Sequence, residues 1–218
     1  MRRDMQLYQD ILAYTPVNEQ EAQDQRVMLA ALEKQMRLDK MAQQTFGGPA
    51  SFDCFDRSAQ AHFACSIWTV SPDASQTLMV HHNIYNSWSW IGGHADGCRD
   101  LAAVALRELQ EETGVEGRLV DCGPGGIYSL EVLTVAGHEK RGRYVSSHLH
   151  LNVTYLAVAD PNDADVVQAL RPKPDENSAV AWVPLGEACA KSSEPWIRDR
   201  IYRKLISKLN GVDLGKLL

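Results

Sequence analysis

Apolar residues recur at helical spacing in the N-terminal part of the chain. Between residues 17 and 36, four of them fall on one face of a helix, namely Val27, Met28, Ala31 and Leu32. Asn18 stands at the N-cap position of this helix, and Glu21, three residues later, completes the pattern of a capping box. Together with a shorter amphipathic run before it, this segment predicts an N-terminal helical extension over residues 1–50.

From Ala61 onward the pattern changes to short runs rich in β-branched and aromatic residues. Six of these runs are typical of strands, namely residues 61–70, 77–82, 117–122, 126–135, 148–159 and 179–183. Residues 100–113 and 194–209 have helical periodicity instead. The sequence therefore predicts one α+β domain over residues 58–218, built on a mixed sheet, after the helical extension.

Composition and charge exclude several classes of protein. With 218 residues, 44% hydrophobic and 23% charged positions, the chain can bury one sizeable core. A net charge of -6 argues against general binding to nucleic-acid polymers or anionic membranes. The chain has no apolar run of about 18 residues, and its five cysteines are odd in number and widely spaced. We therefore expect a cytoplasmic protein without a membrane anchor.

The helix predicted over residues 100–113 carries an unusual acidic end. Leu101, Val104 and Ala105 form its inward stripe, and Glu108, Glu111 and Glu112 continue that stripe within an arc of about 100°. Carboxylates three and four residues apart repel one another, and here they also face the negative end of the helix dipole. A divalent cation compensates both effects, and oxygen ligands favour Mg²⁺ or Mn²⁺.

A glutamate-rich helix end is more often a solvated face with surface ion pairs than a metal site. The inward direction of the three glutamates and the sequence around them favour the metal site here. The segment Gly93 to Val115 resembles the Nudix box of the Nudix hydrolases, G-x5-E-x7-R-E-U-x-E-E-x-G-U, where U is aliphatic. The matching positions are Gly93, Arg107, Glu108, Leu109, Glu111, Glu112, Gly114 and Val115.

The resemblance implies an α/β/α sandwich around a mixed sheet and extends, less sharply, over about residues 60 to 190. It also implies metal-dependent hydrolysis of a diphosphate linkage, in a nucleoside-diphosphate-X type or related substrate, with water as the nucleophile. In the family, the glutamates that correspond to Glu108, Glu111 and Glu112 bind the metal, and the arginine at position 107 aims them. The general base is either Glu108 or the later Glu176, which precedes a predicted strand.

One box position departs from the family pattern, because Arg99 replaces the first glutamate. That glutamate usually has a supporting role, so we expect the metal site to survive. Loss of that glutamate puts the orientation of Arg107 in question. Asp100 could take the place of the missing glutamate. Arg99 has either drifted from the family pattern or been recruited to hold a substrate phosphate, and His94, next to Gly93, is a second candidate for contact with substrate.

His148 and His150 lie two residues apart on a predicted strand and point to one face. We favour a packed or hydrogen-bonded pair over a metal pair, since one strand supplies only two ligands and the sequence assigns no third.

Two rival functions fit the sequence less well. An isopentenyl-diphosphate isomerase is disfavoured because Gly92 stands where that enzyme has a cysteine, and because the intact R-E-U-x-E-E is atypical of it. A non-catalytic nucleotide-sensing module usually carries an added DNA-binding domain, which the net charge does not support. The expected partner is a small-molecule diphosphate whose identity the sequence leaves open, as it does the formation of a homodimer.

Overall fold

A computed structural model describes residues 2–48, 50–140, 142–212 and 214. The chain forms two compact units that alternate along the sequence. Unit 1 comprises residues 1–65, 94–104 and 123–154, and unit 2 comprises residues 66–93, 105–122 and 155–218. The division into an extension over residues 1–50 and a domain over residues 58–218 stays a prediction.

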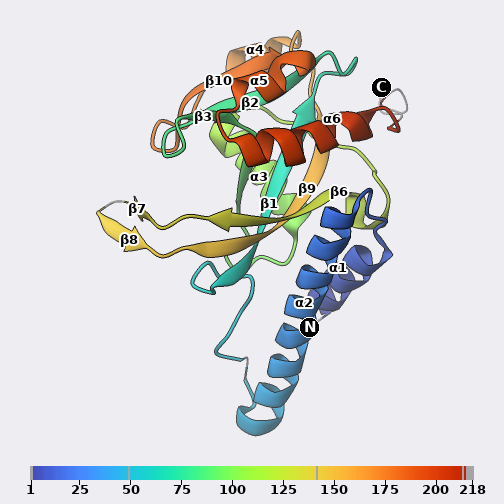
Figure 1. The fold of residues 1–218 in the computed structure, drawn as a ribbon, viewed down its shortest axis with the longest axis vertical. Helices are drawn as coiled ribbons and strands as arrows, with labels where there is room; N and C mark the ends of the chain where they lie inside the picture. Colours follow the sequence, from blue (N-terminus) through green and yellow to red (C-terminus); the bar gives the residue numbers. More distant parts are fainter. Residues whose placement is uncertain (1, 49, 141, 213, 215–218) are drawn as a thin grey trace. The chain divides into compact units, whose positions relative to one another are not determined.

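Unit 1 contains the two N-terminal helices, α1 (Arg2–Ala13) and α2 (Glu19–Phe46), which lie along each other (Figure 1). Helix α2 also packs on β6 (Ile127–Val135). On the predicted apolar face, Met28 and Leu32 are fully buried, whereas Val27 remains 37% exposed. A hairpin of β7 (His138–Lys140) and β8 (Arg143–Val145) follows β6.

The predicted capping box is half formed. The side chain of Asn18 accepts a hydrogen bond from the backbone N–H of Glu21, at 2.8 Å, as expected. The carboxylate of Glu21, however, accepts from the N–H of Val17 rather than from that of Asn18. Its other oxygen accepts from the hydroxyls of Tyr14 and Ser129 and from the N–H of Leu130, at 2.8 to 3.1 Å. Glu21 is fully buried and so joins α2 and the segment after α1 to β6.

Unit 2 is built on a mixed sheet with the strand order β10-β2-β1-β9-β5. These strands are β10 (Asn177–Pro184), β2 (Gln76–His82), β1 (Ala61–Val70), β9 (His148–Val158) and β5 (Arg118–Leu119), with β1 and β9 continuing into unit 1. Strand β3 (Ser87–Ser89) pairs with β2, and β4 (Ile91–His94) pairs with β1.

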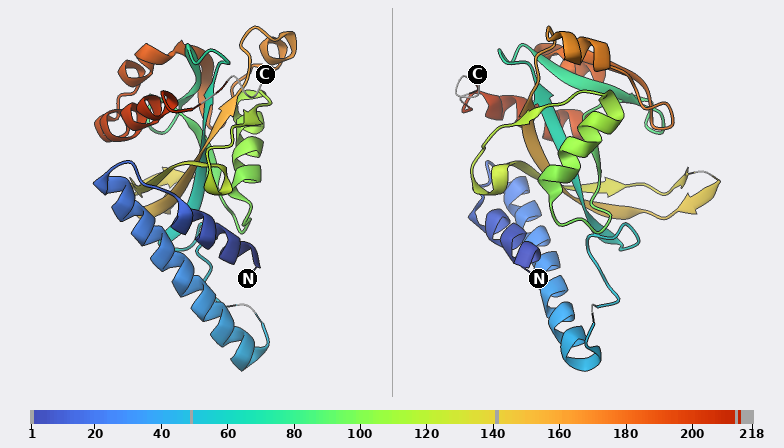
Figure 2. Two further views of the ribbon diagram at one scale, coloured as in Figure 1. Left: turned by 90° about the vertical axis from the view of Figure 1, so that its right-hand side faces the viewer. Right: turned by 180° about the vertical axis from the view of Figure 1, so that it is seen from behind.

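Helices cover both faces of this sheet, α3 (Leu101–Thr113) on one side and the C-terminal helices on the other (Figure 2). The remaining helical segments are η1 (Pro124–Gly126), α4 (Ala164–Ala169), η2 (Leu185–Glu187), α5 (Ala188–Lys191), η3 (Ile197–Tyr202) and α6 (Arg203–Leu209). The rings of Trp68 and Tyr202, both fully buried, lie 5.2 Å apart in the core. The α/β/α sandwich predicted from the sequence is confirmed.

All six predicted strands are present, although the run over residues 117–122 shortens to β5. The sequence did not predict β3 or β4, whose three and four residues are too short to show an alternating pattern. In the part of the chain that the structure describes, we find no helix with the length and apolarity required to span a bilayer.

Candidate active site

Helix α3 begins and ends at the residues that its sequence indicates. The carboxylate of Asp100 accepts a hydrogen bond from the N–H of Ala103, at 3.1 Å, and so caps the N-terminus. Gly114, with φ of 77°, closes the C-terminus by donating its N–H to the carbonyl of Gln110. Leu101 and Ala105 are buried, so the inward stripe predicted from the sequence fixes the rotation of the helix.

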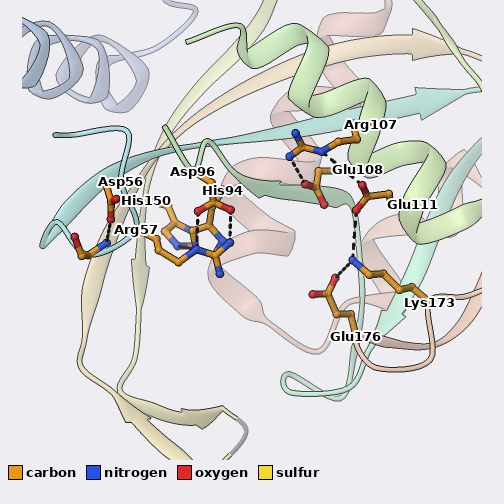
Figure 3. Close-up of polar contacts among 11 residues, drawn as sticks. Asp56, Arg57, His94, Asp96, Arg107, Glu108, Glu111, His150, Lys173 and Glu176 are labelled. Atoms are coloured by element: carbon orange, nitrogen blue, oxygen red, sulfur yellow. Dashed lines mark hydrogen bonds and ion pairs between the residues drawn. The ribbon is translucent and has the colours of Figure 1, made fainter. Parts of the chain in front are cut away.

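The three box glutamates have different environments at the end of α3, within unit 2. Figure 3 shows two of them, Glu108 and Glu111. The side chain of Glu111 is 48% exposed and that of Glu108 is 13% exposed. Glu112 is buried, with 4% of the residue exposed. One helix end therefore presents carboxylates at three depths.

Gly93 at the end of β4 makes room for Glu108. A Cβ atom on Gly93 would lie 2.7 Å from Oε1 and 2.8 Å from Cγ of Glu108, which is closer than any side chain tolerates. The box glycine is therefore needed for contact with the box glutamate.

Glu112 is a buried carboxyl group that two neutral donors hold. Its Oε1 accepts from the N–H of Gly92 at 3.2 Å, and its Oε2 accepts from Nδ2 of Asn177 at 2.7 Å. Burial raises the pKa of Glu112 to about 7, against these two hydrogen bonds, and the charges of Glu108 and Glu176 add to the rise. The carboxyl group thus lacks a full counter-charge within the protein.

Two cations lie among the more exposed carboxylates. Arg107 donates from Nη2 to Oε1 of Glu108 at 3.0 Å, and its Nε lies 3.6 Å from Oε1 of Glu111. The Nζ of Lys173 lies 3.6 Å from Glu111 and 3.2 Å from Glu176 (Figure 3). Burial alone would lower the pKa of Lys173, but the hydrogen bond and charge of Glu176 raise it, so this lysine is charged.

Glu176 reaches this cluster from the turn before β10. Its N–H donates to the carbonyl of Lys173, and its carbonyl accepts from the N–H of Asn83, each at 2.9 Å. The structure therefore brings Arg107 and all four predicted glutamates into one unit. Sequence reasoning missed Lys173 and Asn177, although a lysine three residues before Glu176 was a visible signal.

The donor set of this cluster fits a hard divalent cation. Glu108, Glu111, Glu112 and Glu176 supply only carboxylate oxygens, which Mg²⁺ and Mn²⁺ prefer. The raised pKa of Glu112 is the physical sign that added positive charge is favourable there.

Arg99 has its partners within unit 1. Its Nε lies 3.1 Å from Asp4 of α1, and its Nη2 lies 2.9 Å from Asp53. The guanidinium also donates to the carbonyl of Gly97 and lies 4.6 Å from the centre of the Phe55 ring. Contact of Arg99 with substrate stays a prediction.

His94 lies in a group of four histidines in unit 1, with His62, His148 and His150. Burial lowers the pKa of His62 and lowers that of His150 to about 2, and neighbouring histidines add to both effects. His148 and His150 form a hydrogen-bonded pair, with their Nε2 atoms 3.1 Å apart, but two more histidines that the sequence did not assign join them. Contact of His94 with substrate stays a prediction.

Residues 61–205 match the family model described as the NUDIX domain. The chain belongs to the Nudix family. This match covers two thirds of the sequence and includes the whole box, so the resemblance found from Gly93 to Val115 is confirmed.

Among curated Nudix relatives, the chain is 30% identical over 110 residues to bis(5'-nucleosyl)-tetraphosphatase (asymmetrical) of Rattus norvegicus. This alignment covers 50% of the chain and 60% of the relative, so the chain spans less than two thirds of that protein. Solved Nudix structures include the dihydroneopterin triphosphate pyrophosphohydrolase of E. coli, with a TM-score of 0.49 and 15% identity over 66% of this chain and 95% of that one. An Ap4A hydrolase of C. elegans has a TM-score of 0.47 and 19% identity over 68% and 98%.

Proposed function

We propose that this Nudix protein hydrolyses a diphosphate linkage in a nucleoside-diphosphate-X type or related substrate, with water as the nucleophile. The observation that carries the proposal is the gathering of Glu108, Glu111, Glu112 and Glu176 around Arg107 and Lys173 in unit 2. Two cations do not neutralise four carboxylates, so the cluster has capacity for a divalent ion.

The glutamates of α3 would hold Mg²⁺ or Mn²⁺. When bound, such an ion neutralises diphosphate oxygens and lowers the pKa of a bound water. Arg107 restrains Glu108 and Glu111 through its two contacts, at 3.0 and 3.6 Å. Hydrogen bonds from Gly92 and Asn177 fix the direction of the Glu112 carboxyl group, which would be charged in the metal-bound site.

The general base is Glu108 or Glu176, and the two differ in how they are held. Glu108 lies against Gly93 and is paired with Arg107. Glu176 is paired with Lys173 at the start of β10. Each carboxylate therefore has a cation within ion-pair distance, and either could take the proton of the attacking water.

A screen for product release across diphosphates tests the activity. It should include nucleotide sugars, dinucleoside polyphosphates, oxidised nucleoside triphosphates and non-nucleotide diphosphates, each with Mg²⁺ and with Mn²⁺. Because the rat relative is named a bis(5'-nucleosyl)-tetraphosphatase, dinucleoside polyphosphates come first in the screen.

Two variants and one matched control decide whether the cluster carries the activity. Glu111→Gln and Glu112→Gln should each lower kcat/KM by roughly 100-fold or more, because each removes a charged ligand. Glu116→Gln changes an exposed glutamate just past the same helix, which contacts only Gln110 in this region, and should leave kcat/KM unchanged. Full activity in both ligand variants would contradict the proposal.

The base is identified by comparing Glu108→Gln with Glu176→Gln. Loss of the base should lower kcat and remove the fall in kcat at low pH. The metal concentration for half-maximal activity should not change. Loss of a ligand raises that metal concentration instead.

The cytoplasmic location and the homodimer stay predictions. All five cysteines are free thiols in the structure, which supports a reducing compartment for the proposed reaction. Light scattering on the purified protein measures its mass and thus decides between a monomer and a homodimer.

A further inference from the structure

Four imidazole rings from three strands converge in unit 1, outside the carboxylate cluster. His62 lies on β1, His94 ends β4, and His148 and His150 begin β9. One ring nitrogen from each lies within 4.8 Å of the corresponding nitrogen of all the others. Two of these rings, those of His94 and His150, are labelled in Figure 3 and meet edge to face, with their centres 4.8 Å apart. Histidines from three different strands do not meet through local chain geometry.

Hydrogen bonds orient two of the rings toward the centre of the group. Nδ1 of His62 lies 2.7 Å from the carbonyl oxygen of Ala59, and Nδ1 of His148 lies 2.8 Å from that of Ser146. A carbonyl oxygen only accepts, so both Nδ1 atoms carry the proton in the neutral rings. Each Nε2 atom is then left with a lone pair. Histidines that bind metals are usually oriented by a bond of this kind on the opposite nitrogen.

The inner nitrogens are poorly satisfied by one another. Nε2 of His150 lies 3.1 Å from Nε2 of His94 and 3.1 Å from Nε2 of His148. A single N–H cannot donate well to both. His62 is 1% exposed, and its Nε2 is buried without a hydrogen-bond partner. A buried nitrogen that lacks a hydrogen-bond partner and points toward three other imidazoles is a potential ligand for a metal ion.

We propose that His62, His94, His148 and His150 form a second metal site, for a borderline dication of the Zn²⁺ type. Tetrahedral Zn²⁺ with Zn–N bonds near 2.0–2.1 Å places its ligands about 3.3 Å apart. Two of the pairs already lie at 3.1 Å, and the widest spacing of 4.8 Å closes through small ring rotations. Imidazole ligands suit zinc, whereas carboxylates suit magnesium, so the two sites select different ions.

The charges around the histidines permit a cation. The nearby Arg57 donates from Nε to Asp96 at 2.6 Å, and its Nη2 pairs with the other carboxylate oxygen. This bidentate pair neutralises the charge of Arg57.

A bound ion would connect β1, β4 and β9, because His94 ends β4 just before the chain leads to α3. The role of the ion would be to hold these strand ends together.

Metal titration of the full chain tests the site. The protein is stripped with a chelator, and Co²⁺ and then Zn²⁺ are added while the visible spectrum and the heat of binding are followed. One equivalent of Co²⁺ should give the intense spectrum of a four-coordinate nitrogen site, and Zn²⁺ should displace it. His150→Gln and His148→Gln should each weaken Zn²⁺ binding on the order of 100-fold.

Two controls separate this site from the carboxylates and from histidines in general. His81→Gln changes a histidine of unit 2 that contacts Ser178, and it should bind Zn²⁺ like the parent. Glu111→Gln should also keep Zn²⁺ binding, even if it loses the proposed hydrolase activity. Parent-like binding in the His148 and His150 variants would overturn the proposal, and so would a parent chain whose melting temperature Zn²⁺ does not raise.

Discussion

The guanidinium of Arg99 is paired with the carboxylate of Asp4, 95 residues earlier in the chain. Asp4 is nearly fully buried, with 2% of its side chain exposed, and Asp53 pairs with the other arm of the arginine. The arginine at this box position thus has a structural partner in α1. The departure from the family pattern goes together with the N-terminal helices, which supply the acid that the arginine needs.

Restoring the family residue should therefore destabilise this chain. Arg99→Glu places a third carboxylate beside Asp4 and Asp53 and leaves buried Asp4 without its arginine. We expect the free energy of unfolding to fall by about 2 to 3 kcal/mol, measured by urea denaturation. The control is Arg57→Glu, because the pair of Arg57 with Asp96 is 53% and 43% exposed. That variant should lose about 1 kcal/mol or less, and equal losses would show that burial of Asp4 does not matter.

Glu112 should make the metal-free protein less stable as the pH rises. Its pKa is raised from 4.5 to about 7 by burial, so its contribution to stability is present below pH 4.5 and is lost as the pH rises through 7. The loss amounts to about 3 kcal/mol. Urea denaturation in a chelator, at pH 5 and pH 8, should show this fall in the parent and not in Glu112→Gln.

Added Mg²⁺ provides the matching check for Glu112. Because the proposed ion would bind the charged carboxylate, Mg²⁺ should stabilise the parent more at pH 8 than at pH 5. A parent and a Glu112→Gln variant with the same pH dependence would contradict the raised pKa.

Gly93→Ala should impair activity without unfolding the protein. The added Cβ meets the flexible carboxylate of Glu108, which can move aside but then loses its position. We expect kcat/KM to fall roughly 100-fold and the free energy of unfolding to change by less than about 1 kcal/mol. Gly186→Ala is the control, since a Cβ there meets no atom within 4 Å. An active Gly93→Ala enzyme would show that the position of Glu108 is not critical.

Glu21→Gln should lower the free energy of unfolding, whereas Glu112→Gln should relieve the loss of stability at high pH. The carboxylate of Glu21 accepts hydrogen bonds from Val17, Tyr14, Ser129 and Leu130. The amide of Glu21→Gln turns a donor toward them, which should cost about 2 kcal/mol in the free energy of unfolding. Glu33→Gln, on the exposed side of the same helix where it accepts only from Tyr8 in this region, should cost less than about 0.5 kcal/mol.

Periodicity and the box motif predicted much of unit 2. The stripe of Leu101 and Ala105 fixed which way the glutamates point, since 3.6 residues per turn leave little freedom once one face is buried. The strands were recognised because each long run is apolar enough to exclude a loop. Glu176 was predicted only from the resemblance to the family, in which a later loop can supply the base, because nothing local indicates that the turn before β10 folds toward α3.

The contacts that sequence reasoning missed join residues far apart in the chain. His62 meets His148 across 86 residues, and Arg99 meets Asp4 across 95. Neither pair has a local pattern, because their proximity depends on the order of strands and on helix packing. Glu21 is intermediate: the capping pattern located its helix start, but the burial of its carboxylate against β6 depended on tertiary packing.

Lys173, between Glu111 and Glu176, gives the proposed magnesium site a resident counter-ion. Its ammonium group balances part of the charge whenever the site is free of metal, so the carboxylates need not spread apart. A divalent ion held by the glutamates would take the place of the ammonium group, and Lys173 would then be available to a substrate phosphate. Lys173 would thus neutralise the carboxylates in the metal-free protein and contact the substrate in the metal-bound protein.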